Sequence, residues 1–227
     1  MGALHDGHMS LVKKAIEEND LTVVSIFVNP TQFNNNDDLV KYPRTLEADA
    51  LLLRDISDNL IVFAPSVDDM YPKGQHSNNY DFNGLDKVME GAFREGHYNG
   101  VATIVEKFLT TVKPNNAYFG EKDFQQLQII RNLVALKKIP VRIIGCPIIR
   151  EPNGLARSSR NERLSKEMRK EASFIYNTLL EFKKKFEKMR DAASLEVINQ
   201  KKTNTKYMLF IAVYAEEIRL IDNIALN

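Results

Sequence analysis

Two histidines near the start of the chain, His5 and His8, form a His-x-Gly-His motif that leads into an apolar pattern typical of one helix face. Residues three apart at a helix start project the same way, over the turn where backbone N–H groups lack partners. That end carries the positive pole of the helix dipole, which favours an anion such as phosphate. Imidazoles can donate hydrogen bonds to phosphate oxygens and move protons, and Gly7 lets a ligand approach the backbone.

The motif alone leaves three interpretations open: phosphate binding, half of a metal site, or plain surface residues at a helix start. A zinc site would need further ligands, and the neighbouring sequence offers none at the usual spacing. The rest of the chain has to decide among them.

Asn29 and Gln32 directly follow an apolar run that predicts a buried strand over residues 22–28. Uncharged amides at a strand end suit the recognition of hydroxyl or carboxylate groups. Because Asn-Pro is also an ordinary turn, the pair by itself does not distinguish binding from turn formation.

The run Gly120-Glu121-Lys122-Asp123 follows a predicted strand over 117–119 and opens a predicted helix. There a lysine can reach a phosphate, an acid can accept ribose hydroxyls, and a glycine leaves room. The alternative is plain helix capping, with Asp123 as an acid in the first turn. Gln126 lies one turn further along this helix.

Ser158, Ser159 and Arg160, with Arg157 before them, come shortly after the turn Pro152-Asn153-Gly154. Hydroxyls and a guanidinium suit the departing phosphates of a nucleotide, and a position at a hinge would let a small domain bring them in. A second polar, glycine-framed loop carries Arg94 and His97, and it could hold a ligand or serve only packing.

Strands and helices alternate over the first two thirds of the chain, which predicts an α/β, Rossmann-like parallel sheet covered on both faces. Further strands are expected over 59–65 and 141–149, and helices over 45–56, 100–113 and 123–138, with 66–84 rich in loops. Ligands of such sheets bind beyond the carboxyl ends of the strands, so the turns at 29–32 and 120–123 should line one crevice.

A smaller α+β domain is expected after this sheet, which divides the chain into domains 1–148 and 149–227. A charged helix is predicted from Ser165 to Met189, and short strands over 195–198, 207–214 and 218–221.

Composition excludes several classes of protein. Of 227 residues, 31 are Lys or Arg and 30 Asp or Glu, a net charge of +1 that does not favour nucleic acid or an anionic membrane. No apolar run approaches the roughly 18 residues of a membrane helix. The single cysteine, Cys146, lies in an apolar run and is expected to be a buried structural thiol. A cytoplasmic location fits this cysteine usage.

Seven stretches, in order along the chain, resemble the pantothenate synthetase (pantoate–β-alanine ligase) family. They are MGALHDGH (1–8), VSIFVNPTQF (24–33), YPRTLEAD (42–49), EGAFREGHYNGVATIV (90–105), YFGEKDFQQL (118–127), GLARSSRNERLS (154–165) and RLIDNI (219–224). The combination is far more specific than His-x-Gly-His, which nucleotidyltransferases and class I synthetases share.

The resemblance implies a two-step ligation. ATP adenylates the carboxylate of pantoate and releases pyrophosphate, and the amine of β-alanine then attacks the acyl-adenylate to give pantothenate and AMP. Mg²⁺ accompanies ATP in the family, with Asp49 a candidate for contact with a metal, and the family's proteins are usually homodimers.

The resemblance also implies the roles of individual residues. Catalytic roles fall to His5, His8 (the proton donor), Lys122 and Arg160, and pantoate and β-alanine contacts to Gln32 and Gln126, with Asn29 beside them. The ATP-binding positions are Met1, Gly2, Ala3, Leu4, His5, Asp6, Gly7, His8, Gly120, Glu121, Lys122, Asp123, Ile149, Arg157, Ser158, Ser159 and Arg160.

The chain departs from the family's pattern in three places. The family has a strand before Met1, so the sheet is expected to lack its first strand. Position 157 is arginine where the family usually has an aliphatic residue or methionine, so the added cation could aid phosphate binding or obstruct adenine. Residues 190–217 form a shorter region than in the family, and the turn after 208–215 lacks the usual glycine.

Two rival hypotheses remain. Another His-x-Gly-His enzyme, such as a cytidylyltransferase or a pantetheine-phosphate adenylyltransferase, would lack the pair Gln32 and Gln126 and the separate C-terminal domain. A non-catalytic nucleotide-binding protein on the same fold would bind ATP but release no pyrophosphate.

Overall fold

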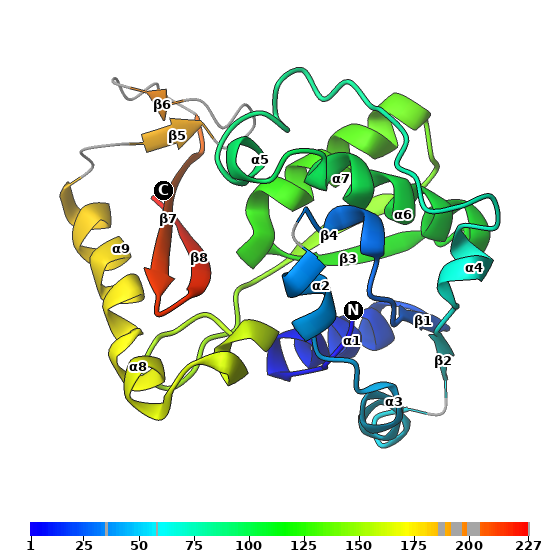
Figure 1. Ribbon diagram of the computed structural model, residues 1–227, viewed down its shortest axis with the longest axis horizontal. Helices are drawn as coiled ribbons and strands as arrows, with labels where there is room; N and C mark the ends of the chain where they lie inside the picture. Colours follow the sequence, from blue (N-terminus) through cyan, green and yellow to red (C-terminus); the bar gives the residue numbers. More distant parts are fainter. Residues whose placement is uncertain (35, 58, 186–188, 192–196, 199–204, 227) are drawn as a thin grey trace. The chain divides into compact units, whose positions relative to one another are not determined.

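The computed structural model describes residues 1–34, 36–57, 59–185, 189–191, 197–198 and 205–226, and it divides into two compact units (Figure 1). The first unit comprises Met1–Gly120 and Gln125–Cys146, and the second comprises Glu121–Phe124 and Pro147–Asn227. The second unit thus begins slightly before the boundary expected from the sequence. It also contains residues 121–124, which were expected to belong to the first domain, 1–148.

The first unit contains two parallel strand pairs, as the alternation of strands and helices predicted. The first pair is β1 (Thr22–Ser25) with β2 (Leu60–Phe63), in a register that sets Val23 opposite Ile61. The second is β3 (Asn116–Gly120) with β4 (Arg142–Cys146), with Tyr118 opposite Ile144. Cys146 is buried, as expected.

Met1 extends the first strand pair on its other side. Its nitrogen donates to Ser25 O at 2.8 Å, and its carbonyl accepts from Phe27 N at 2.9 Å. This is the pattern of a residue in a parallel ladder opposite Ile26. The loop that leads to the first helix therefore leaves from a position beside β1.

Helices and short 3₁₀ turns connect these strands. They are α1 (Asp6–Glu18), η1 (Pro30–Gln32), α2 (Asn36–Lys41), α3 (Leu46–Arg54), α4 (Val67–Met70), α5 (Glu90–Phe93), α6 (His97–Val112), η2 (Glu121–Asp123) and α7 (Phe124–Lys137). α1 forms because Leu11, Val12 and Ala15 share one face, which is buried. Val12 packs with Val24 and Leu53, so this face fixes the start of the helix, and its histidines, against β1 and α3.

The segment 66–84, expected to be rich in loops, contains α4. Ser66 and Asp69 form a capping box: the Ser66 hydroxyl accepts from Asp69 N at 3.1 Å, and the Asp69 carboxylate accepts from Ser66 N at 2.8 Å. The expectation of a loop is therefore corrected at this point, where the Ser-x-x-Asp spacing in the sequence is typical of a helix start.

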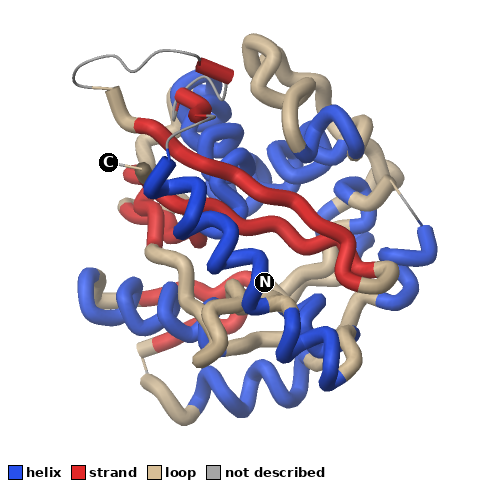
Figure 2. Tube along the Cα trace, turned by 90° about the vertical axis from the view of Figure 1, so that its left-hand side faces the viewer, coloured by secondary structure: helices blue, strands red, loops and turns tan. Residues whose placement is uncertain are grey.

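The second unit is built on an antiparallel sheet of strand order β6-β5-β7-β8, beside which α9 lies (Figure 2). Its elements are η3 (Ser159–Arg163), α8 (Lys166–Glu171), α9 (Ser173–Lys185), β5 (Met189–Asp191), β6 (Val197–Ile198), β7 (Tyr207–Ala215) and β8 (Ile218–Ala225). The expected strands over 207–214 and 218–221 are confirmed. Of the strand expected over 195–198, only Val197 and Ile198 fall within the described residues.

The single helix predicted from Ser165 to Met189 is wrong in two respects. It breaks at Ala172 between α8 and α9, and Met189 lies in β5. At the break, Asn153 donates from Nδ2 to the carbonyl of Arg169 at 2.9 Å, which satisfies an acceptor at the end of α8. Residues 186–188, and residues 192–196 and 199–204 of the region 190–217 expected to be short, lie outside the described residues.

The turn between β7 and β8, which lacks the family's usual glycine, has Glu216 at the position with positive φ. Glu216 adopts a φ of 55°, in the left-handed region where glycine is normally preferred. Its carboxylate accepts from the Ser165 hydroxyl at 2.6 Å, and Ser165 in turn caps α8 through Met168 N. These hydrogen bonds join the hairpin to the start of α8 and offset the cost of the unfavourable φ.

Candidate active site

The two histidines of the motif lie together at the start of α1. His5 is the N-cap residue, and its Nδ1 accepts from Gly7 N at 3.1 Å. The ring centroids of His5 and His8 are 4.0 Å apart. Because Nδ1 of His5 serves as an acceptor, a neutral His5 carries its proton on Nε2, where it is a hydrogen-bond donor. The pair thus combines imidazole groups with the positive end of a helix dipole.

Asp49 holds the loop in front of these histidines. Its carboxylate accepts from Ala3 N at 2.9 Å and from Leu4 N at 2.8 Å, and also from the Thr45 hydroxyl at 3.1 Å. Ala3 has a φ of 48°, which is unfavourable for a residue with a side chain. The buried carboxylate therefore fixes a strained loop that was predicted to bind the nucleotide.

Asp49 was the candidate for contact with a metal, and that contact stays a prediction beside the hydrogen bonds by which Asp49 holds the loop. Among the described residues there is no cluster of three or more His, Cys, Asp or Glu side chains that could hold a metal ion.

Within the same residues, no helix is long and apolar enough to cross a membrane.

The turn η1 carries Gln32, and the N-terminal part of α6 holds it. The carbonyl of Gln32 lies 2.8 Å from His97 Nδ1. Gly100 packs so closely on the turn that an added Cβ would lie 2.3 Å from Thr31 O. His97 is buried, so the glycine-framed loop contributes a packing residue that fixes the backbone of a candidate substrate residue.

Asn29, predicted to bind substrate, lies beneath this turn with only 2% of its surface exposed. Its Oδ1 accepts from the Tyr71 hydroxyl at 2.6 Å and from the Thr31 hydroxyl at 3.2 Å. Its Nδ2 donates to Gly100 O at 3.1 Å and to Gln32 Oε1 at 3.4 Å. Asn29 therefore supports Gln32, which is only half-buried.

Two adjacent glutamines at the start of α7 have different surroundings. Gln125 is buried and donates to the carbonyls of Leu85 and Val88, each at 2.7 Å, while it accepts from Glu90 N at 3.0 Å. These hydrogen bonds hold the loop before α5 in place. Gln126 is half-buried, and its contact with substrate stays a prediction from the resemblance.

Gly120 ends β3, and a Cβ added there would meet no atom within 4 Å. The open space fits the expectation that this glycine leaves room for a ligand. Lys122 and Asp123 follow in the second unit, with Lys122 Nζ 3.6 Å from Asp123 Oδ1.

The strand β8 positions the turn η2 through a residue that the sequence analysis missed. Asn223 is buried, and its Nδ2 donates to the carbonyls of Glu121 and Lys122, each at 2.9 Å. Its neighbour Asp222 is paired with Arg150, with Oδ1 at 3.0 Å from Nη2. The adjacent polar residues Asp222 and Asn223, between the apolar residues Ile221 and Ile224, were the available signal in the sequence.

The predicted phosphate loop begins as a short hairpin and ends in η3. Arg157 N donates to the carbonyl of Ile149 at 2.9 Å, and the Ser158 hydroxyl accepts from Arg160 N at 3.3 Å as the cap of η3. Ser159 is 8% exposed. These four candidate nucleotide contacts thus share one continuous segment of the second unit.

Glu151 is the centre of an ionic cluster that holds this segment. Its Oε1 accepts from Arg157 at 3.2 Å, from Asn161 Nδ2 at 2.9 Å and from Arg169 at 2.9 Å. Burial tends to raise the pKa of the Glu151 carboxyl. The hydrogen bonds of Arg169 and Asn161 and the charges of Arg169 and Arg157 outweigh burial and hold that pKa below its ordinary value of 4.5.

The predicted site residues fall in both units. Met1–His8, Asn29, Gln32, Asp49, Gly120 and Gln126 belong to the first unit, and Glu121–Asp123, Ile149 and Arg157–Arg160 belong to the second. A site that combines the two sets remains a prediction.

Comparison with known proteins gives the same family along the whole chain. The family model described as pantoate-beta-alanine ligase matches residues 1–225. The pantothenate synthetase of Christiangramia forsetii is 48% identical over 253 residues, which covers 100% of this chain and 89% of that protein.

Solved structures of the family resemble this fold closely. The pantothenate synthetase from Thermus thermophilus superposes with a TM-score of 0.90 and 38% sequence identity, covering 100% of this chain and 91% of that one. The pantoate-beta-alanine ligase from Francisella tularensis, complexed with beta-gamma ATP and beta-alanine, gives a TM-score of 0.82 at 40% identity, covering 100% and 87%. The chain therefore belongs to the pantoate-beta-alanine ligase family.

Proposed function

We propose that this protein is a pantothenate synthetase that joins pantoate to β-alanine at the expense of ATP, through a pantoyl-adenylate. The observation that carries the proposal is the pair His5 and His8 at the start of α1, in a chain that matches the family over residues 1–225. The structure of the Francisella tularensis relative with beta-gamma ATP and beta-alanine supports ATP and β-alanine as ligands.

In the first step, a carboxylate oxygen of pantoate attacks the α-phosphorus of ATP, and the bond to the β-phosphate oxygen breaks. Negative charge develops on the α-phosphate and on the leaving pyrophosphate, so donors placed around both groups lower the barrier. His8 and Nε2 of His5 are such donors at the α1 N-terminus. Lys122 and Arg160, with the hydroxyls of Ser158 and Ser159, are proposed to bind the phosphates.

In the second step, the amine of β-alanine attacks the acyl carbon of the adenylate, an amide bond forms, and AMP leaves. Gln32 and Gln126 are proposed to hold pantoate, since amides can bind both hydroxyl and carboxylate groups. Glu121 and Asp123 are suited to the ribose hydroxyls. The acyl-adenylate is sensitive to water, so exclusion of solvent protects it between the steps.

Mg²⁺ is proposed to enter as part of the MgATP substrate. The described residues contain no cluster of ligands for a protein-held ion, and Asp49 is occupied by backbone N–H groups. Magnesium commonly keeps several waters and binds through substrate phosphates, which is consistent with that arrangement.

A homodimer is proposed as the assembled state. Apolar side chains that are exposed on α3 and β2 support it, namely Leu51 at 57%, Leu52 at 47% and Ile61 at 49%. An interface between copies would cover such a surface. Light scattering on the purified protein tests this, and a monomeric mass at micromolar concentration would contradict it.

A cytoplasmic location stays a prediction.

Pyrophosphate release from ATP tests the proposed function. It is measured with neither acid nor amine, with pantoate alone, and with pantoate plus β-alanine, and His8→Ala serves as the inactive control. Release that requires pantoate, with pantothenate and AMP formed only when β-alanine is present, is the expected result. ATP binding without release would favour the non-catalytic rival, and release with another acceptor would favour a different nucleotidyltransferase.

A further inference from the structure

The hydroxyl of Tyr71 is connected to Gln32 through a single buried side chain. Tyr71 follows α4 and is 3% exposed, and its hydroxyl donates to Asn29 Oδ1 at 2.6 Å. Asn29 Nδ2 then donates to Gln32 Oε1 at 3.4 Å. The chain Tyr71–Asn29–Gln32 therefore runs from the core to a half-buried candidate substrate residue.

The orientation of the Asn29 amide follows from its other neighbours. Its Nδ2 also faces the carbonyl of Gly100 at 3.1 Å, and Oδ1 faces the hydroxyls of Tyr71 and Thr31. A flipped amide would set Oδ1 against the Gly100 carbonyl, two acceptors with no proton between them. The two hydroxyls and the carbonyl thus fix one orientation.

That orientation decides what Gln32 offers to a ligand. Because Asn29 donates to Gln32 Oε1, this oxygen is engaged, and the Nε2 amide group remains as the donor. A donor at this place suits an acceptor, such as a carboxylate or hydroxyl oxygen of an acid substrate. Burial raises the pKa of Tyr71 above its ordinary value of 10.0, against the opposing hydrogen bonds of Thr31 and Asn29. Its proton is therefore retained under ordinary assay conditions.

We propose that Tyr71 is a positioning residue that acts through Asn29 to orient the amide of Gln32 toward the acid substrate. This inference rests on the proposed function, since it concerns the binding of pantoate. Tyr71 itself is packed in the core with Met70 and Ile104, and it acts without contact with the substrate.

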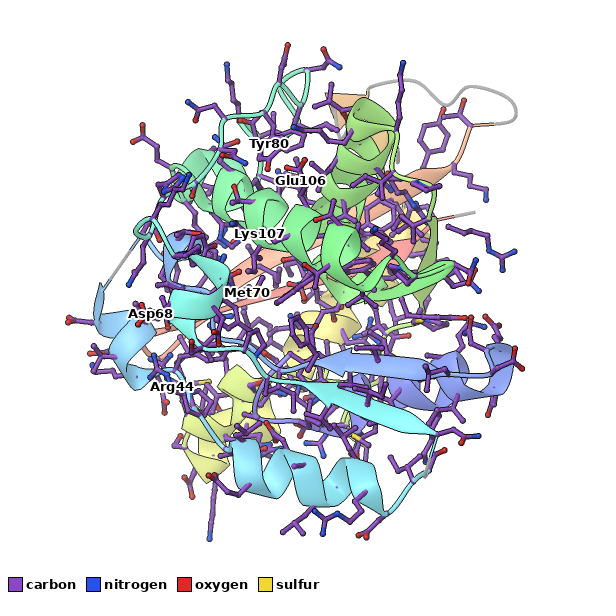
Figure 3. All side chains as sticks on the ribbon, turned by 90° about the vertical axis from the view of Figure 1, so that its right-hand side faces the viewer. Arg44, Asp68, Met70, Tyr80, Glu106 and Lys107 are labelled. Carbon is purple, nitrogen blue, oxygen red and sulfur yellow. The ribbon has the colours of Figure 1, made fainter. Side chains whose placement is uncertain are left out.

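Tyr80 provides a matched control for Tyr71. It is also buried, at 8%, and its hydroxyl donates to Glu106 at 2.6 Å (Figure 3). The two rings even have similar cations above them, Lys107 over Tyr71 and Lys137 over Tyr80, each 5.2 Å from the ring centroid. Replacement of either tyrosine by phenylalanine removes one buried hydroxyl, but only Tyr71 is linked to Asn29.

The test compares Tyr71→Phe with Tyr80→Phe in pantoate-dependent pyrophosphate release. Tyr71→Phe is expected to raise the KM for pantoate about tenfold, as for loss of a typical orienting hydrogen bond, and to leave the KM for ATP within about twofold. Tyr80→Phe is expected to change neither KM. Both variants should show similar small decreases in Tm, because each loses the two hydrogen bonds of one hydroxyl: Tyr71 with Asn29 and Thr31, and Tyr80 with Glu106 and Asn78.

A double-mutant cycle separates positioning from general stability. In a Gln32→Ala background, Tyr71→Phe should change the KM for pantoate by less than about twofold, because the group on which it acts is gone. Should Tyr71→Phe fail to fold, Thr31→Val removes the other hydroxyl on Asn29 Oδ1 and is expected to raise the same KM about threefold.

Three results would overturn the inference while the proposed function stands. They are a pantoate KM that rises as much in Tyr80→Phe, a KM that rises equally for ATP and pantoate, and full additivity in the cycle. If the wild-type protein itself shows no pantoate-dependent release, the proposed function is wrong and this inference fails with it.

Discussion

The turns η1 and η3 both carry candidate binding residues, but they are held by different forces. η1, with Gln32, is fixed by uncharged groups: the amide of Asn29, the hydroxyl of Tyr71, and the close approach of Gly100. η3 and the residues before it are fixed by the ionic cluster around Glu151. One turn depends on shape and neutral hydrogen bonds, and the other on charge.

The two turns are therefore expected to be sensitive to different changes: η1 to added volume and η3 to loss of charge. Neutral buried hydrogen bonds are insensitive to salt and to pH near neutrality. Close contacts between backbone atoms, however, leave no space for an added atom. A charged cluster tolerates small changes of shape, whereas loss of one sign leaves the other uncompensated. The polar loop at η3 is proposed to bind phosphates, and a charged support there is compatible with a loop that rearranges around an anion.

The largest effect is expected from Gly100→Ala. Its Cβ would lie 2.3 Å from Thr31 O and 2.6 Å from Thr31 C, atoms of the backbone that cannot rotate away. We expect a loss of about 2–3 kcal/mol in the free energy of unfolding, together with a raised KM for pantoate, because η1 must move. Urea unfolding and pyrophosphate release measure the two effects.

Gly120→Ala is the matched control for stability, since its Cβ would meet nothing within 4 Å. It should leave the free energy of unfolding within about 0.5 kcal/mol of the wild type. Equal stability of Gly100→Ala and the wild type would show that η1 is not held by this close contact.

The next effect concerns the charged turn. Glu151→Gln keeps the size of the side chain but removes the charge that Arg157 and Arg169 share. We expect a loss of about 1–2 kcal/mol in stability and a several-fold rise in the KM for ATP, with the KM for pantoate unchanged. The reverse selectivity, with pantoate affected and ATP spared, would contradict the assignment of η3 to the phosphates.

Glu162→Gln is the control for this change, because Glu162 also bonds Arg169 but its side chain is 67% exposed. An exposed ion pair contributes little, so stability should change by less than about 0.5 kcal/mol. A loss of stability as large as that of Glu151→Gln would mean that the exposed Glu162 stabilises the protein as much as the buried Glu151 does.

The two turns should also differ in how far acid lowers the stability that they contribute. The pKa of Glu151 is held below its ordinary value of 4.5 in the folded protein, so its contribution is fully present above that pH. The contribution is lost as the pH falls below 4.5 through the lowered folded-state pKa. Between pH 7 and pH 3, the free energy of unfolding of the wild type should therefore fall more steeply than that of Glu151→Gln. Parallel decreases in the two proteins would contradict this role of Glu151.

The sequence predicted those parts of the fold that depend on local pattern. Alternating apolar runs and turns predicted both parallel strand pairs, and the spacing of Leu11, Val12 and Ala15 predicted α1. The break at Ala172 was missed because Asn153, which donates to the carbonyl of Arg169 at the end of α8, lies in a separate turn, and no local sequence pattern indicates that contact.

The candidate site likewise contains residues that local sequence predicts and residues that it does not. Histidines at a helix start can be recognised from spacing, but Asn29 and Gln32 look alike in a sequence, as do Gln125 and Gln126. Burial and hydrogen-bond partners distinguish the supporting amide from the half-buried one, and these depend on α6 and on the loop before α5. The role of Asn223 likewise arises from contacts with a segment far away in the sequence, and that of Glu151 from the way the chain from 151 to 169 folds back on itself.

The smallest effect is expected from Arg157→Met, which also sharpens the comparison between the turns. Arg157 lies 3.2 Å from Glu151, and its side chain is 24% exposed. Glu151 would keep Arg169 and Asn161, so the charge remains compensated and stability should fall by less than about 1 kcal/mol. If Arg157 also contacts the nucleotide, the KM for ATP should rise about twofold to threefold, and this rise should shrink in high salt because exposed charges are screened. An unchanged or lower KM for ATP would mean that the arginine is only a neighbour of Glu151, and that the phosphates depend on Ser158, Ser159 and Arg160.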